Sequence, residues 1–105
     1  MRQIRKNKKF IYLISPNKIQ NEKFYSNLRK VLSSKKVSFF QLRLKNESFN
    51  KQIYIGKKIK KICKKFKVKF LINDDAYLAK KLNADGCHLG QNDMNIRKAR
   101  ELIGN

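Results

Sequence analysis

With 105 residues, the chain has the length of one small domain or of part of a larger one, and its 41% hydrophobic content is enough for a packed core. Twenty-seven Lys and Arg against seven Asp and Glu give a formal net charge of +20. Such a charge raises nucleic acid or an anionic membrane as partners. The lysines are spread along the chain, however, and no signature of a known nucleic-acid module is present. A compositional bias is the favoured interpretation, with a basic nucleic-acid-binding module as the alternative.

The N-terminal segment resembles a signal peptide but lacks its apolar core. The apolar run Phe10–Ile14 is shorter than the roughly 7 to 15 residues that such a core needs, and no stretch is long enough to span a bilayer. We therefore expect a cytoplasmic protein without a membrane partner. Cys63 and Cys87 form no CxxC pair, which predicts two reduced thiols in the core.

The first half of the chain alternates short apolar runs with helical patterns. Residues 10–14 predict a strand that ends in a turn at 15–17, after a basic extension at 1–9. Residues 37–44 predict a second strand. The two helices that follow these strands are marked by apolar residues at helical spacing, Phe24, Leu28, Val31 and Leu32 in the first and Ile55, Ile59, Ile62 and Phe66 in the second. The lysines of the second helix are expected to form a solvated face.

The second half continues the alternation. Residues 68–72 predict a third strand, 76–84 a third helix, and 85–90 a short strand with its turn. Ile96, Ala99 and Ile103 mark a last helix. Repeated strand–helix units imply a parallel sheet, which is either an open doubly wound sheet or part of a (β/α)8 barrel. Since a whole barrel takes roughly 200 residues or more, the barrel alternative would make this chain about half of one, as a single partial domain.

Polar side chains follow the second strand, where α/β proteins bind their ligands. Gln41, Arg43 and Lys45 alternate along the chain, so a continuous strand would project all three from one face at steps of about 6.6 Å. An amide, a guanidinium and an ammonium in a row form a clamp for an anion such as phosphate. The alternative is the polar outer face of an edge strand, and the row by itself does not decide.

Acidic residues follow the third and fourth strands. Asn73 and Asp74 end the third strand, and Asp75 is placed to cap the next helix. Neighbouring strands lie about 4.8 Å apart, so Asp74 and Asp93 could share one Mg²⁺, although both could also be helix caps. With an anion clamp on the adjacent strand, the metal site is favoured. His88 is either a barrel-interior histidine or a donor to a substrate.

The segments "QLRLK", "LINDDAYLAKKLNADGCHLGQND" and the "AR" at 99 and 100 closely resemble thiamine-phosphate synthases, which are (β/α)8 barrel enzymes. The resemblance covers about residues 12–104 and implies a parallel (β/α)4 half of a TIM barrel. The family joins hydroxymethylpyrimidine pyrophosphate to thiazole phosphate and releases pyrophosphate, by a dissociative route without a nucleophilic side chain. The residues that the resemblance assigns to the pyrimidine substrate are Gln41, Arg43, Lys45 and Asn73, and those that it assigns to Mg²⁺ are Asp74 and Asp93.

Half a barrel lacks part of the site. The family's barrel continues with four more strands, whose loops hold the thiazole phosphate, so we expect the 105 residues alone to be inactive. We also expect the first and fourth strands to be unpaired edges that invite self-association. The further alternative is a thiazole tautomerase-like or regulatory relative, which would be expected to lack the paired Asp.

Overall fold

The computed structural model describes residues 2–7 and 10–88 of the chain, in which a five-stranded sheet is combined with three helices. The elements are β1 (Arg2–Asn7), β2 (Phe10–Ile14), α1 (Lys23–Leu32), β3 (Phe39–Leu42), α2 (Phe49–Lys65), β4 (Lys69–Asn73), α3 (Ala76–Leu82) and β5 (Gly86–His88). The predicted strands and helices up to residue 88 are therefore confirmed in type and order. The predicted last helix lies outside the described residues.

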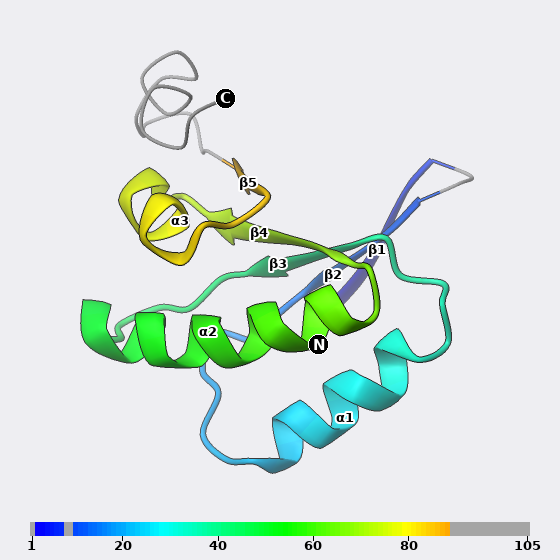
Figure 1. Ribbon diagram of the computed structural model, residues 1–105, viewed down its shortest axis with the longest axis horizontal. Helices are drawn as coiled ribbons and strands as arrows, with labels where there is room; N and C mark the ends of the chain where they lie inside the picture. The colour runs from blue at the N-terminus through cyan, green and yellow to red at the C-terminus, as the bar shows by residue number, and fades with distance from the viewer. Residues whose placement is uncertain (1, 8–9, 89–105) are drawn as a thin grey trace.

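The sheet follows the order of the sequence, β1-β2-β3-β4-β5, and β2 to β5 are parallel. Each right-handed crossover leads to the next neighbour, so the helices fall on one face of the sheet. Figure 1 shows α1 and α2 on the same side of it. A doubly wound sheet would reverse its direction of growth at a switch point, and the described part of the sheet has no such reversal. The architecture is half of a (β/α)8 barrel.

The core lies between the sheet and the helices. Alternate residues of β3 and β4 face the helices, and they are fully buried because side chains in a strand alternate between its two faces. The residues that fill this layer from the sheet are Leu13, Phe40, Leu42, Phe70 and Ile72, and those from the helices are Tyr25, Leu28, Leu32, Ile55, Ile59, Ile62, Cys63, Leu78 and Leu82. The predicted inward face of α2 is thus confirmed, apart from a half-buried Phe66 at its end.

Two details of the predicted elements are wrong. Val31 is 36% exposed, and Tyr25 takes its place in the core, because the inward stripe of α1 runs through residues 25, 28 and 32. The strand predicted at 37–44 is shorter, since β3 ends at Leu42. Arg43 and Lys45 consequently lie beyond the strand, and its alternation does not fix their directions.

The strand β1 has no counterpart in the prediction. It pairs antiparallel with β2, with an irregular register between Arg5 and Asn7. The expectation that the first predicted strand would be an unpaired edge is therefore wrong. The sequence RQIRKN carries no apolar alternation, so its strand depends on the partner that β2 offers rather than on a pattern of its own.

Among the described residues, none of the helices combines the length and the apolar character that crossing a bilayer requires.

Candidate functional site

Gln41 lies in the middle of the sheet. Its strand β3 is paired with β2 on one side and with β4 on the other, and the side chain is 7% exposed. The alternative that Gln41 lies on the polar outer face of an edge strand is therefore wrong. Its side chain points to the face opposite the helices, as Phe40 and Leu42 point toward them.

A chain of hydrogen bonds connects the carboxyl ends of β3 and β4. The Gln41 Nε2 donates to the Asn73 Oδ1 at 2.7 Å, and the Asn73 Nδ2 donates to the Asp74 Oδ2 at 3.0 Å. Each amide thereby fixes the orientation of the next polar group. A buried amide on the central strand controls the position of an exposed carboxylate at the edge of the sheet.

Asp74 adopts an unusual backbone conformation. Its φ is 59°, in the left-handed region, where Asp is tolerated better than most residues. Its backbone N–H donates to the carbonyl oxygen of His88 at 2.6 Å, which extends the link between β4 and β5 beyond the last pair of the sheet. The conformation is costly and is held by these contacts, as is common at functional sites.

Asp75 has a structural role, as predicted. Its side-chain Oδ1 accepts a hydrogen bond from the Leu78 backbone N–H at 2.9 Å, and its backbone is extended, with φ of −145°. This is the geometry of a helix N-cap, which satisfies one of the unpaired N–H groups at the start of α3.

The segment after β3 is tied to the segment after β2. The Ser15 hydroxyl oxygen accepts from the Arg43 backbone N–H at 2.8 Å, and the Ser15 N–H donates to the Gln41 carbonyl oxygen at 3.0 Å. The Lys45 N–H donates to the Asn17 carbonyl oxygen at 3.0 Å. Arg43 is half-buried and Lys45 is exposed, so both cationic groups lie near the carboxyl end of β3.

Sequence reasoning treated Ser15 as a turn former and missed its role in positioning this segment. Ser15 is only 5% exposed, and it directly follows an apolar strand and precedes a proline. A small polar residue at the end of a buried strand is the signal that could have identified it.

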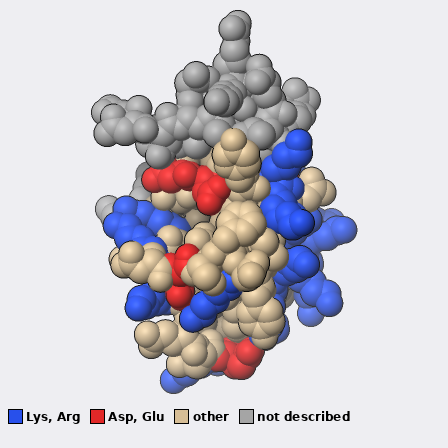
Figure 2. Space-filling view, turned by 90° about the vertical axis from the view of Figure 1, so that its left-hand side faces the viewer, with Lys and Arg blue, Asp and Glu red and all other residues tan. Residues whose placement is uncertain are grey.

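Figure 2 looks onto the side of the molecule to which the carboxyl ends of the strands point, and it shows acidic side chains near the grey atoms with Lys and Arg around them. Acids are scarce in this chain, so a surface of mixed sign here differs from the lysine-rich surface of the helices. Such a surface can hold a cation and an anion side by side.

His88 is the last residue of β5 and is in register with Asn73. Its side chain is exposed. Because the interior face of this half barrel is uncovered in the described residues, the exposure does not decide between an interior histidine and a contact with a substrate, and both stay predictions.

The described residues fit a metal ion only in part. They include no group of three or more His, Cys, Asp and Glu side chains that could hold a metal. Asp74 offers an exposed carboxylate at the sheet edge, and Asp93 lies outside the described residues. Mg²⁺ is often held by one or two carboxylates together with the phosphates of a substrate, so one Asp here is compatible with such a site.

The parallel strands β2 to β5, which follow one another in order and carry polar side chains at their carboxyl ends, define this chain as part of a (β/α)8 barrel. Enzymes with this fold bind their substrates at those ends. The family model described as thiamine monophosphate synthase matches residues 11–105. The chain belongs to the thiamine monophosphate synthase family.

Individual relatives agree with this assignment. The chain is 68% identical over all of its 105 residues to a thiamine-phosphate synthase from Pelagibacter ubique, of which it covers 51%. It is 42% identical over 78 residues, 74% of the chain, to a thiamine-phosphate synthase from Flavobacterium psychrophilum, of which that match covers 37%. A solved thiamine phosphate pyrophosphorylase from Pyrococcus furiosus superimposes with a TM-score of 0.77 at 28% identity, over 90% of this chain and 45% of that one. The chain spans about half the length of the relatives that it matches.

Proposed function

We propose that these residues form the pyrimidine-binding half of a thiamine-phosphate synthase. The reaction joins hydroxymethylpyrimidine pyrophosphate to thiazole phosphate, with thiamine phosphate and pyrophosphate as products. The observation that carries this proposal is the hydrogen-bonded chain from Gln41 through Asn73 to Asp74 at the carboxyl edge of a barrel-type sheet. Membership of the synthase family supports it.

Each side chain has a role that suits its chemistry. The amides of Gln41 and Asn73 hold and orient the pyrimidine, because an amide offers both a donor and an acceptor. Arg43 offers a planar fork to the diphosphate oxygens, and Lys45 adds a mobile point charge. His88, exposed at the same edge, is proposed to donate to the substrate.

No side chain acts as a nucleophile in this proposal. The bond between the pyrimidine methylene carbon and the pyrophosphate oxygen breaks, and the electron pair leaves with pyrophosphate. The thiazole nitrogen then forms the new bond to that carbon. The contribution of Arg43 and Lys45 is electrostatic, since they stabilise the negative charge that develops on the leaving group.

We propose that Asp74 and Asp93 hold a Mg²⁺ ion. When bound, the ion would neutralise charge on the diphosphate. The hydrogen bond from the Asn73 amide and the constrained backbone hold the Asp74 carboxylate in place before any ligand arrives. Such preorganisation lowers the cost of binding.

We propose that the 105 residues alone do not turn over and that they self-associate. The thiazole phosphate elements of the family lie in strands beyond this half of the barrel. The sheet face opposite the helices carries half-buried apolar side chains, Tyr12, Ile14, Phe39 and Leu71, and Tyr12 and Phe39 stack with ring centroids 4.4 Å apart. The buried side chains of α1, α2 and α3 share one core on the other face of the sheet, and a second copy is the proposed cover of this one.

Calorimetry tests the proposed site on a chain extended to the length of its relatives. In the presence of Mg²⁺, we expect Asp74→Ala and Asp93→Ala to bind the pyrimidine pyrophosphate at least tenfold more weakly than the parent. Glu22→Gln, which removes an exposed acid on another part of the surface, is the matched control and should bind like the parent. If both Asp variants keep the parent's affinity and its dependence on Mg²⁺, the two-Asp site is wrong.

A further inference from the structure

The described residues form an open hollow at the amino ends of the strands, opposite the carboxyl ends where the proposed synthase site lies. It has a volume of about 410 Å³ and lies between the last turns of α2, the start of β4 and the segment that joins α3 to β5. Lys69, on its wall, begins β4, and Asn73 ends it, which separates the two edges by about 13 Å at the rise of a strand. The hollow is therefore distinct from the proposed synthase site.

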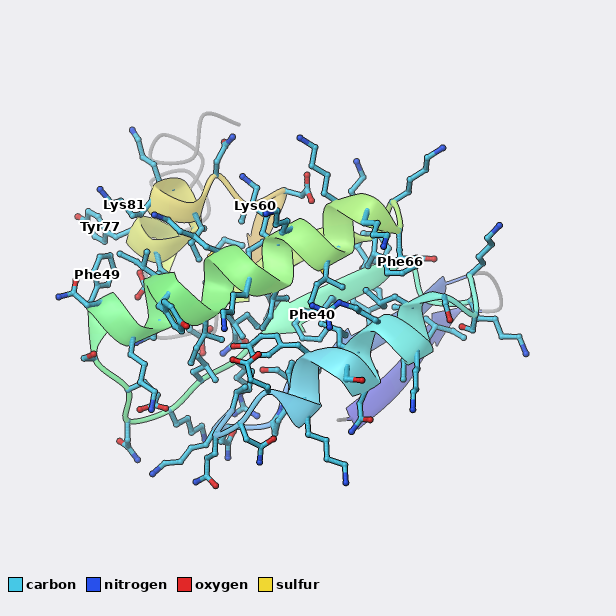
Figure 3. The ribbon with its side chains drawn as sticks, turned by 60° about the horizontal axis from the view of Figure 1, so that its bottom comes forward. Phe40, Phe49, Lys60, Phe66, Tyr77 and Lys81 are labelled. Carbon is cyan, nitrogen blue, oxygen red and sulfur yellow. The ribbon has the colours of Figure 1, made fainter. Side chains whose placement is uncertain are left out.

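Four lysines converge on this hollow from three different elements. Lys60 and Lys64 are one turn apart on α2, Lys67 lies in the turn that follows, and Lys69 opens β4. Figure 3 shows Lys60 on the side of α2 that faces the segment after α3, in agreement with its place in the wall. Lys67 has a φ of 59°, so the chain turns sharply there and brings the helix and the strand to one opening.

The positive charge of the hollow is poorly balanced. None of the four ammonium groups takes part in an ion pair among the described residues, whose ion pairs are those of Lys51 and Lys58. Asp85 is the one acid in the wall, and its Oδ2 already accepts from the Phe70 backbone N–H at 2.7 Å. Like charges one helical turn apart repel each other, and an anion in the hollow would relieve that repulsion.

A purely structural account covers only part of this cluster. Lysines in the last turn of a helix interact favourably with its dipole, which explains Lys64 and its neighbour Lys65. That effect does not apply to Lys69 in the strand, nor to the hollow itself. The Asn83 amide in the wall adds a donor, and Val68 and Phe70 form an apolar floor.

We propose that this hollow binds a small polyphosphate anion, with two or three linked phosphate groups. Its volume falls in the range of small-molecule sites, and lysine is a mobile point charge that suits phosphate oxygens. A concave cluster fits a compact anion better than the extended backbone of a nucleic acid, which needs a basic strip. The proposal does not depend on the proposed synthase activity, since it uses different residues at the other edge.

Calorimetric titration of the purified chain with inorganic tripolyphosphate, without Mg²⁺ and at low salt, tests this proposal. The variant Lys60→Gln/Lys64→Gln should bind at least tenfold more weakly than the parent. The control Lys57→Gln/Lys61→Gln removes the same charge from exposed positions of the same helix and should stay within twofold of the parent. Without ligand, the hollow variant should melt no lower than the control, which shows that lost binding is not lost folding.

Three outcomes would overturn the proposal. One is equal weakening in the two double variants, which would make the effect one of overall charge. Another is that the parent shows no measurable binding at tripolyphosphate concentrations up to about 1 mM, a value on the order of a weak specific dissociation constant. The third is that a 12-base-pair DNA duplex binds more tightly than tripolyphosphate and that both double variants lose this DNA binding to the same degree. Tenfold weakening confined to the hollow variant would support it.

Discussion

Asp74 and Asp75 are neighbours in the chain, yet they do different work because their backbones differ. Asp75 is extended and turns its carboxylate to the start of α3, whereas Asp74 has a positive φ and receives a hydrogen bond from Asn73. The two carboxylates are therefore not interchangeable. The tasks of the two are set by geometry and not by their shared chemistry.

Cys63 is the residue whose ionisation the fold changes most clearly. Burial, with a smaller effect from the charge of Asp85, raises the pKa of its thiol to about 12. In the unfolded chain a thiol has a pKa of about 8.5. The folded state therefore keeps a proton that the unfolded state loses between these values. The contribution of this thiol to the free energy of unfolding is therefore constant below about pH 8.5 and decreases as the pH rises toward 12.

We predict that Cys63 resists alkylation in the folded chain. At pH 8, iodoacetamide should modify half-buried Cys87 first and Cys63 only after urea unfolds the protein, because the thiolate is the reactive form. Mass spectrometry of the labelled chain measures both rates, and Cys87→Ser isolates Cys63. Equal rates for the two thiols in the folded state would contradict the prediction.

At the scale of elements, α2 is the helix that contacts the sheet and both of the other helices. It buries Ile55, Ile59 and Ile62 against the sheet, and its Gly56 lies against Leu82 of α3. A second contact joins it to α1, because the Lys58 ammonium binds the Glu22 carboxylate at 2.8 Å and lies 5.0 Å from the ring centre of Tyr25. The hydrogen bond to the Glu22 carboxylate raises the pKa of Lys58.

We predict that Gly56→Ala destabilises the chain. A Cβ at this position would meet Leu82 Cδ1 and would lie 3.2 Å from its Cδ2. Overpacking typically costs 1 to 3 kcal/mol, against a gain of about 1 kcal/mol from helix propensity, so a net loss of up to about 2 kcal/mol is expected. Urea unfolding measures it.

The partner of this contact provides the control. In a Leu82→Val background, with a shorter side chain opposite, Gly56→Ala should cost less or become stabilising. Lys57→Ala, at the exposed neighbouring position, should change the free energy of unfolding by less than about 0.5 kcal/mol. An equal cost of Gly56→Ala in both backgrounds would show that α3 does not press on this site.

At the scale of the whole molecule, one edge of the sheet is covered by β1, a strand whose sequence lacks the apolar alternation typical of strands. The pairing of β1 with β2 covers an edge that would otherwise present unpaired backbone groups. The parallel half barrel therefore begins with an antiparallel strand. Figure 1 shows β1 at the margin of the sheet, beside β2.

We predict that removal of residues 1–7 makes the chain prone to aggregation, because the edge of β2 is then open. Static light scattering of the truncated and parent chains at equal concentration measures this. The control Arg2→Gln/Arg5→Gln lowers the charge and keeps the backbone pairing, so it should scatter no more light than the parent does. Aggregation of the control to the same degree would assign the effect to charge.

The half-barrel class was predicted from the resemblance to the synthase family. The residue pattern by itself determined the parallel α/β sheet, the buried stripe of α2 and the Asp75 cap. These features depend on local periodicity and on rules for neighbouring elements, which a single chain carries in its residue pattern. The synthase family was also legible, because its motifs are contiguous segments.

The tertiary structure decided the rest. It placed Gln41 within hydrogen-bonding distance of Asn73, and the Ser15 hydroxyl within hydrogen-bonding distance of the Arg43 N–H. It also put Tyr25 rather than Val31 in the core and paired β1 with β2. It also gathered Lys60, Lys64, Lys67 and Lys69 around one hollow. Apart from the Tyr25 stripe, which follows the helical period, these features depend on contacts between segments distant in the chain, whose energies no local pattern encodes.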